Sequence, residues 1–94
     1  MTLLSDAQVQ QRLQAAGEWR RGEEPAIVRD FVFSDFAAAI AFVDRVAAAA
    51  EVAGHHPDIL LHGWNKVRLT LSTHSQGGLT EADFDLAREI DSLL

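Results

Sequence analysis

The sequence predicts an α+β domain in which three helices pack on one face of a four-stranded antiparallel sheet. Helix-type spacing of apolar residues occurs near both ends and in the middle of the chain, and strand-type alternation fills the two segments between, giving the order α-β-β-α-β-β-α. A length of 94 residues leaves room for one domain. With 48% apolar and 23% charged residues, the composition is that of a globular protein. We therefore treat residues 1–94 as a single domain.

The first elements are a helix and a hairpin. Ser5 or Asp6 can cap the helix through a side-chain oxygen, and Gly17 is expected to end it. Residues 19–33 then alternate as two strands, with a turn at residues 22–25. The side chains expected on the core face of this hairpin are Ile27, Phe31 and Phe33.

The longest element is predicted to be a middle helix that is capped by Ser34 and ends near Gly54, before Pro57. Its expected core stripe consists of Phe36, Ile40, Val43 and Ala47. Beside or opposite this stripe lie Ala37, Ala38, Ala41 and Ala48. These alanines are either plain helix formers or a close-packing face for a second subunit, and both interpretations stay open.

A second hairpin and a last helix complete the fold. Residues 59–63 and 67–74 alternate as strands, and Thr80 can cap the last helix. Its expected core face consists of Phe84, Ala87, Ile90 and Leu94. Because an open four-stranded sheet keeps two unpaired edges, we expect a homodimer or a dimer of dimers.

Charge and composition exclude several classes of function. The formal net charge of −6, from 14 acidic and 8 basic residues, disfavours binding to nucleic acid and to anionic membranes. The absence of cysteine excludes disulfides, thiolate nucleophiles and cysteine-type zinc sites. No secretion signal or membrane-spanning segment is visible, so we expect a cytoplasmic protein.

All four histidines lie within residues 55–74, where the middle helix joins the second hairpin. Histidine titrates near neutral pH, so several imidazoles around one pocket can donate one proton and accept another. His55 and His56 follow the helix end, and Glu51 lies one turn earlier, where it could orient His55. Acid–base catalysis is the sharper interpretation, and simple capping of the helix by these histidines is the alternative.

The remaining candidates are weaker when taken one by one. His74 ends a predicted strand, whereas His62 faces away from Ile59 and Leu61 and is left out of the site. Asp83 fits a capping box with Thr80, which is a structural role. A three-histidine zinc site is the rival interpretation, but the side chains of adjacent histidines diverge, so the pattern favours acid–base chemistry over a metal.

Taken together, these residues form a spaced signature. Its members are Glu51, then after three residues His55-His56-Pro57, after six Trp64, after nine His74, and after eight Asp83. The signature resembles that of the pterin-4a-carbinolamine dehydratase family, and the resemblance covers nearly the whole chain. It implies dehydration of 4a-hydroxytetrahydropterin to quinonoid dihydropterin and water, in tetrahydropterin recycling, with no metal or organic cofactor.

The resemblance also implies roles for particular residues. His55, His56 and His74 match the catalytic histidines, and Glu51 and Asp83 match the supporting carboxylates. The implied pterin-binding residues are Trp19, Gly54, Pro57, Ser72, Thr73 and Ser75. Gly54 and Ala82 stand where some relatives have an acidic and a basic residue, which concerns affinity rather than the type of reaction. Animal members also act as dimerisation cofactors, so a non-catalytic pterin-binding or protein-dimerisation module is the alternative function.

Overall fold

The computed structural model describes residues 2–23 and 25–94, which form one four-stranded antiparallel sheet with helices packed against it. The elements in chain order are α1 (Asp6–Gln14), β1 (Arg20–Arg21), β2 (Ile27–Val32), α2 (Phe36–Ala53), β3 (Asp58–His62), β4 (Lys66–Leu71), the 3-10 helix η1 (His74–Gln76) and α3 (Glu81–Asp91). The predicted order is confirmed, and η1 is an addition to it. Met1, and Glu24 in the predicted first turn, lie outside the described residues.

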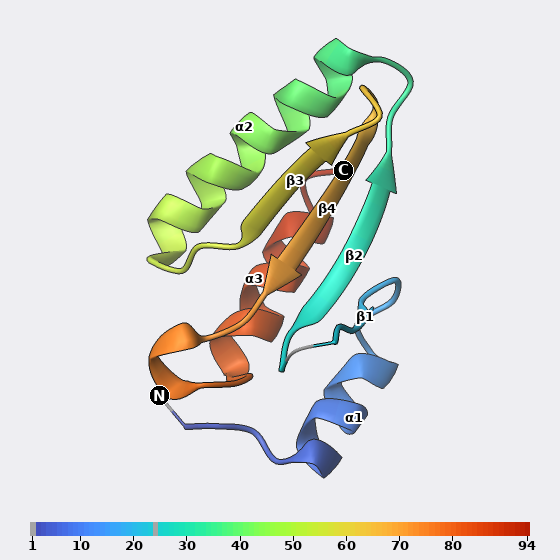
Figure 1. The fold of residues 1–94 in the computed structure, drawn as a ribbon. Helices are drawn as coiled ribbons and strands as arrows, with labels where there is room; N and C mark the ends of the chain where they lie inside the picture. The colour runs from blue at the N-terminus through green and yellow to red at the C-terminus, as the bar shows by residue number, and fades with distance from the viewer. Residues whose placement is uncertain (1, 24) are drawn as a thin grey trace.

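The strands lie in the order β1-β2-β4-β3, so β1 and β3 are the edges of the sheet. Helices α2 and α3 cover one face, and α1 lies beyond the end of β2 (Figure 1). On the covered face Ile27 is opposite Leu71 and Phe31 is opposite Val67, and all four side chains are buried. This alternation buries one side of each strand and leaves the other side outward. Among the described residues, no helix is long and apolar enough to span a membrane.

The buried stripe of α2 differs from the expected one. The side chains that face the sheet are Ala39, Phe42, Val46 and Ala50. Phe36 and Ile40 are 52% and 40% exposed instead. The helix is apolar on most of its circumference, so spacing alone does not identify its inner face; that face is the one on which Phe42 packs against Phe31, with ring centroids 4.8 Å apart.

Several element ends also differ from the sequence-based expectation. Asp35, rather than Ser34, caps α2, because its carboxylate accepts from the Ala38 N–H at 2.7 Å. Strand β4 ends at Leu71, before His74, because the chain turns back through a bridge between Thr73 and Gly78.

The helices at the two ends of the chain agree better with the expectation. Ser5 caps α1 and Thr80 caps α3, each within a capping box. Phe84, Ala87 and Ile90 are buried as expected. Leu94 is 61% exposed, because α3 ends at Asp91.

The outward face of the sheet carries a cluster of charges. Arg20 and Arg68 each donate to Asp30 at 2.8 Å from neighbouring strands. The hydrogen bonds from Arg68, and then from Arg20, hold the pKa of Asp30 below its ordinary value, although partial burial acts in the opposite direction. Asp30 in turn raises the pKa of Arg68.

Candidate active site

The end of α2 fixes the position of the two adjacent histidines. Gly54 has a φ of 63°, the left-handed conformation that glycine adopts without strain, and its N–H binds the last carbonyls of the helix. The N–H of His55 binds the carbonyl of Ala50 at 3.2 Å. This C-terminal motif places His55 and His56 directly at the carboxyl end of α2, as the sequence predicted.

His55 binds the carboxylate of Asp83, with 2.6 Å between Nε2 and Oδ1. Asp83 lies in the first turn of α3, 28 residues further along the chain, and its side chain has no exposed surface. The His55 side chain is 13% exposed. A buried carboxylate at this distance holds the imidazole in one orientation.

The second carboxylate oxygen of Asp83 accepts two hydrogen bonds. Oδ2 accepts from the hydroxyl of Thr73 at 2.8 Å and from the backbone N–H of Thr80 at 3.0 Å. The capping box predicted for Thr80 and Asp83 is therefore present, and the same carboxylate reaches His55. One side chain thus both closes the capping box and binds His55. Thr80 was recognised from sequence only as a helix cap; no spacing rule points to its hydroxyl as part of the site.

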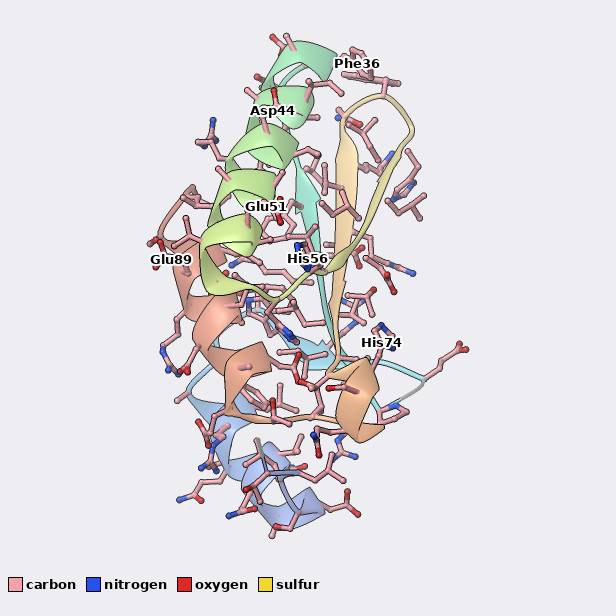
Figure 2. The ribbon with its side chains drawn as sticks, turned by 90° about the vertical axis from the view of Figure 1, so that its left-hand side faces the viewer. Phe36, Asp44, Glu51, His56, His74 and Glu89 are labelled. Atoms are coloured by element: carbon pink, nitrogen blue, oxygen red, sulfur yellow. The ribbon has the colours of Figure 1, made fainter. Side chains whose placement is uncertain are left out.

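His56 turns to the other predicted carboxylate. Its Nε2 lies 2.6 Å from Oε2 of Glu51, and both side chains are mostly exposed. Figure 2 shows Glu51 and His56 next to each other at the end of α2. The sequence analysis paired Glu51 with His55; in the structure Glu51 serves His56, and Asp83 serves His55.

His74 begins η1 and is exposed. In Figure 2 it lies below His56, at the end of β4. His74 is positioned relative to His55 by its neighbour in the chain: Thr73, the preceding residue, donates to the Asp83 carboxylate that binds His55.

The predicted pterin-binding residues divide into two groups. Gly54 and Ser75 are exposed, and Pro57 is half-buried beside the histidine pair. The others have partners inside the chain: the Ser72 hydroxyl donates to the carbonyl of Pro25, Thr73 is 3% exposed and Trp19 is 3% exposed.

Trp19 lies in the core near the far end of α3. Its indole N–H donates to Asp91 at 2.9 Å, and its ring packs edge-on against Phe31. Asp91 lies eight residues beyond Asp83 on α3, which corresponds to roughly 12 Å along the helix axis. The structure therefore places Trp19 in the core rather than beside His55.

A groove of about 690 Å³ between α2 and α3 reaches His55. Its lining is mainly apolar and includes Ala48, Val52, Ala53, Ala82 and Leu86. Ala48 belongs to the alanine set for which two interpretations were open, and here it borders this groove. Within the described residues, no group of three His, Cys, Asp or Glu side chains is arranged to hold a metal ion.

The fold and the two contacts define a small α+β protein that carries two imidazole–carboxylate pairs at the end of α2. The family model described as pterin 4 alpha carbinolamine dehydratase matches residues 2–93. The chain is 58% identical over 92 residues to a protein of Nocardia farcinica, covering 97% of this chain and 94% of that protein. It is 51% identical over 94 residues, the full length of both chains, to a protein of Acidobacterium capsulatum. Both relatives carry pterin-4-alpha-carbinolamine dehydratase as a provisional name.

Two solved structures resemble this fold. A transcriptional coactivator/pterin dehydratase from Brucella melitensis superposes with a TM-score of 0.92 at 34% identity, over 98% of each chain. A pterin dehydratase-like protein described as a RuBisCO assembly factor in the alpha-carboxysome superposes with a TM-score of 0.68 at 35% identity, over 81% of this chain and 88% of that one. This chain belongs to the pterin 4 alpha carbinolamine dehydratase family.

Proposed function

We propose that this protein catalyses the dehydration of a 4a-hydroxytetrahydropterin to quinonoid dihydropterin and water. The observation that carries the proposal is the pairing of two adjacent imidazoles with separate carboxylates, at 2.6 Å in each case, in a chain of this family. A dehydration that protonates the leaving oxygen and removes a proton from the cation uses two groups that exchange protons near neutral pH.

The reaction requires two proton transfers. One imidazolium donates its proton to the 4a oxygen while the C4a–O bond breaks, and water leaves. The lone pair of the adjacent ring nitrogen stabilises the resulting cation, from which a second, neutral imidazole removes a proton. Each transfer contributes on the order of 10²- to 10⁴-fold in rate. The proposed participants are His55, His56 and His74, with Asp83 and Glu51 holding the first two.

Substrate binding is proposed to involve the residues around the histidines that remain accessible. These are Gly54, Pro57 and Ser75, with Ser72 at the edge of the site. Neither Gly54 nor Ala82 supplies a charged side chain here, so the pterin is held through backbone groups and short polar side chains.

The test of the proposal is a stopped-flow assay with synthetic 4a-hydroxytetrahydropterin. We expect dehydration that is faster than in buffer and proportional to protein concentration. A rate equal to that in buffer alone would rule out the enzymatic function and favour a non-catalytic role.

The second candidate is a non-catalytic role as a pterin-binding or protein-assembly module. It is favoured by the descriptions of the two similar structures as a transcriptional coactivator and a RuBisCO assembly factor. Pterin binding measured by calorimetry, without acceleration of dehydration, is the result expected for a module that only binds pterin.

We further propose that the protein is a homodimer or a dimer of dimers and acts in the cytoplasm. Among the described strands β3 pairs only with β4, which leaves one row of its backbone groups open, and Ile59 and Leu60 on this strand are 38% and 52% exposed. Phe36 and Ile40 of α2 are also exposed. Light scattering at micromolar concentration should give the mass of a dimer or tetramer, and a monomeric mass would contradict this proposal.

A further inference from the structure

Two buried threonine hydroxyls lie behind the carboxylate that holds His55. Thr73 is 3% exposed and Thr80 is fully buried. Their hydroxyl oxygens are 2.8 Å apart, and the Thr73 hydroxyl is also 2.8 Å from Oδ2 of Asp83. The sequence resemblance suggested Thr73 as a substrate contact, but its burial and its bond to Asp83 point to a role inside the protein.

The direction of each hydrogen bond in this cluster follows from counting donors. The single hydroxyl hydrogen of Thr73 goes to the Asp83 carboxylate, which has no hydrogen to give. Thr73 therefore accepts from the hydroxyl of Thr80. Thr80 in turn accepts from backbone N–H groups in the first turn of α3. These bonds run one way, from the α3 backbone through both hydroxyls to Asp83.

This one-way chain fixes Oδ2 of Asp83 as an acceptor and leaves Oδ1 to His55. A carboxylate carries no hydrogen, so Nε2 of His55 donates its own hydrogen to Oδ1. In the neutral imidazole, Nδ1 is then the atom with the free lone pair. If the Thr73 hydroxyl were missing, one fixed donor to Oδ2 would be lost and the carboxylate could rotate away from His55.

We propose that Thr73 and Thr80 are positioning residues that lock the Asp83 carboxylate, so that His55 keeps its hydrogen on Nε2 and uses Nδ1 to exchange a proton with the substrate. The second half of this inference rests on the proposed dehydration. The first half concerns the protein alone, and it can be tested without substrate.

The direct test is nitrogen NMR on the wild-type protein labelled with 15N in histidine, at about pH 9, where ordinary imidazoles are neutral. We expect the His55 ring to show the hydrogen on Nε2, with a hydrogen-bonded Nε2–H proton. A ring with its hydrogen on Nδ1 would overturn the inference whether or not the protein is a dehydratase.

Variants then test the contribution of the hydroxyl. Thr73→Val keeps the shape of the side chain and should give a mixture of His55 tautomers, a kcat about 10-fold lower and a nearly unchanged KM. Thr73→Ser restores the hydroxyl and should recover both the tautomer and kcat, which separates positioning from packing. Thr70→Val, on the outward face of β4, is the matched control and should change neither.

The outcomes separate the two proposals. An NMR result as expected with no dehydration in any variant would leave the positioning role standing and remove the proposed function. Active enzyme in which Thr73→Val keeps both the wild-type tautomer and the wild-type kcat would overturn the positioning role. If Thr73→Val fails to fold, Thr80→Val, which removes the donor to the Thr73 hydroxyl, is compared with Thr80→Ser, which keeps it. A wild-type tautomer and kcat in Thr80→Val would then overturn the positioning role.

Discussion

Replacing Asp83 by asparagine should disrupt the candidate site while preserving its shape. The native carboxylate accepts from His55 at 2.6 Å, from Thr73 at 2.8 Å and from the Thr80 N–H at 3.0 Å. If the amide oxygen of the variant takes the position facing the two threonines, the amide NH₂ faces Nε2 of His55. The imidazole must then accept there and move its hydrogen to Nδ1.

The stability change follows from these three contacts. A hydrogen bond to a charged group stabilises by about 1.5–3 kcal/mol and a neutral one by about 0.5–1.5 kcal/mol. Two bonds become neutral and the third changes its direction, so the free energy of unfolding should fall by about 3 kcal/mol. For a domain of this size that lowers Tm by about 12–24 °C. Urea denaturation at pH 7 measures it.

The catalytic change should be larger. With the hydrogen on the wrong nitrogen, His55 loses its proposed proton transfer, and kcat should fall about 10²-fold or more. Glu51→Gln is the matched control for stability, because the Glu51–His56 pair is mostly exposed and should contribute no more than about 1 kcal/mol. Asp83→Asn with wild-type stability and kcat, or with a stability loss equal to that of Glu51→Gln, would refute this reasoning.

Three further predictions follow from the fold and the histidines. Phe42→Ala should lower the free energy of unfolding by about 3–5 kcal/mol, and Phe36→Ala should lower it by less than about 1 kcal/mol. The reverse order in urea denaturation would mean that the stripe containing Phe36 faces the sheet. Because the pKa of Asp30 is lower in the folded protein than in the unfolded chain, where it is about 4, ionised Asp30 stabilises the fold above that pH, and the stabilisation is lost as pH falls through the folded pKa. The difference in free energy of unfolding between wild type and Asp30→Asn should therefore shrink from pH 7 toward about pH 2. A difference that persists at low pH would contradict this prediction. Alanine at any one of the proposed catalytic histidines, His55, His56 or His74, should lower kcat about 10-fold or more in the stopped-flow assay, and double variants should lose less than the summed effects. His62→Ala should stay within about 2-fold of wild type, and an equal loss in His62→Ala would move the site to the outward face of the sheet.

Local patterns predicted the parts of the fold that are fixed locally. The end of α2 at Gly54 and the capping box of α3 could both be read from sequence, because a left-handed glycine and a Thr-x-x-Asp start depend on a few adjacent residues. The inner face of α2 could not. Its apolar residues surround the helix, and the choice of Phe42 over Phe36 is made by the rings of Phe31 in β2 and Phe33 just after it.

The site was predictable as a set of residues but not as a set of contacts. The signature brought out the histidines and both carboxylates, but the carboxylate assigned to His55 was the one closest in sequence. In the structure that partner is Asp83, because the contact between α2 and α3 brings together residues 28 positions apart. The contact between the two hydroxyls behind Asp83 was missed for the same reason: Thr73 was expected to bind substrate and Thr80 to cap α3, and they meet only when the chain turns back at the Thr73–Gly78 bridge.

The most direct measurement of the central claim compares two proteins on one preparation of 4a-hydroxytetrahydropterin. Wild-type protein should accelerate its dehydration in the stopped-flow spectrometer. A folded variant with alanine at all three proposed catalytic histidines should give the rate of buffer. If the variant dehydrates the substrate as fast as wild type, the imidazoles do not carry the reaction, and the account of this site is wrong.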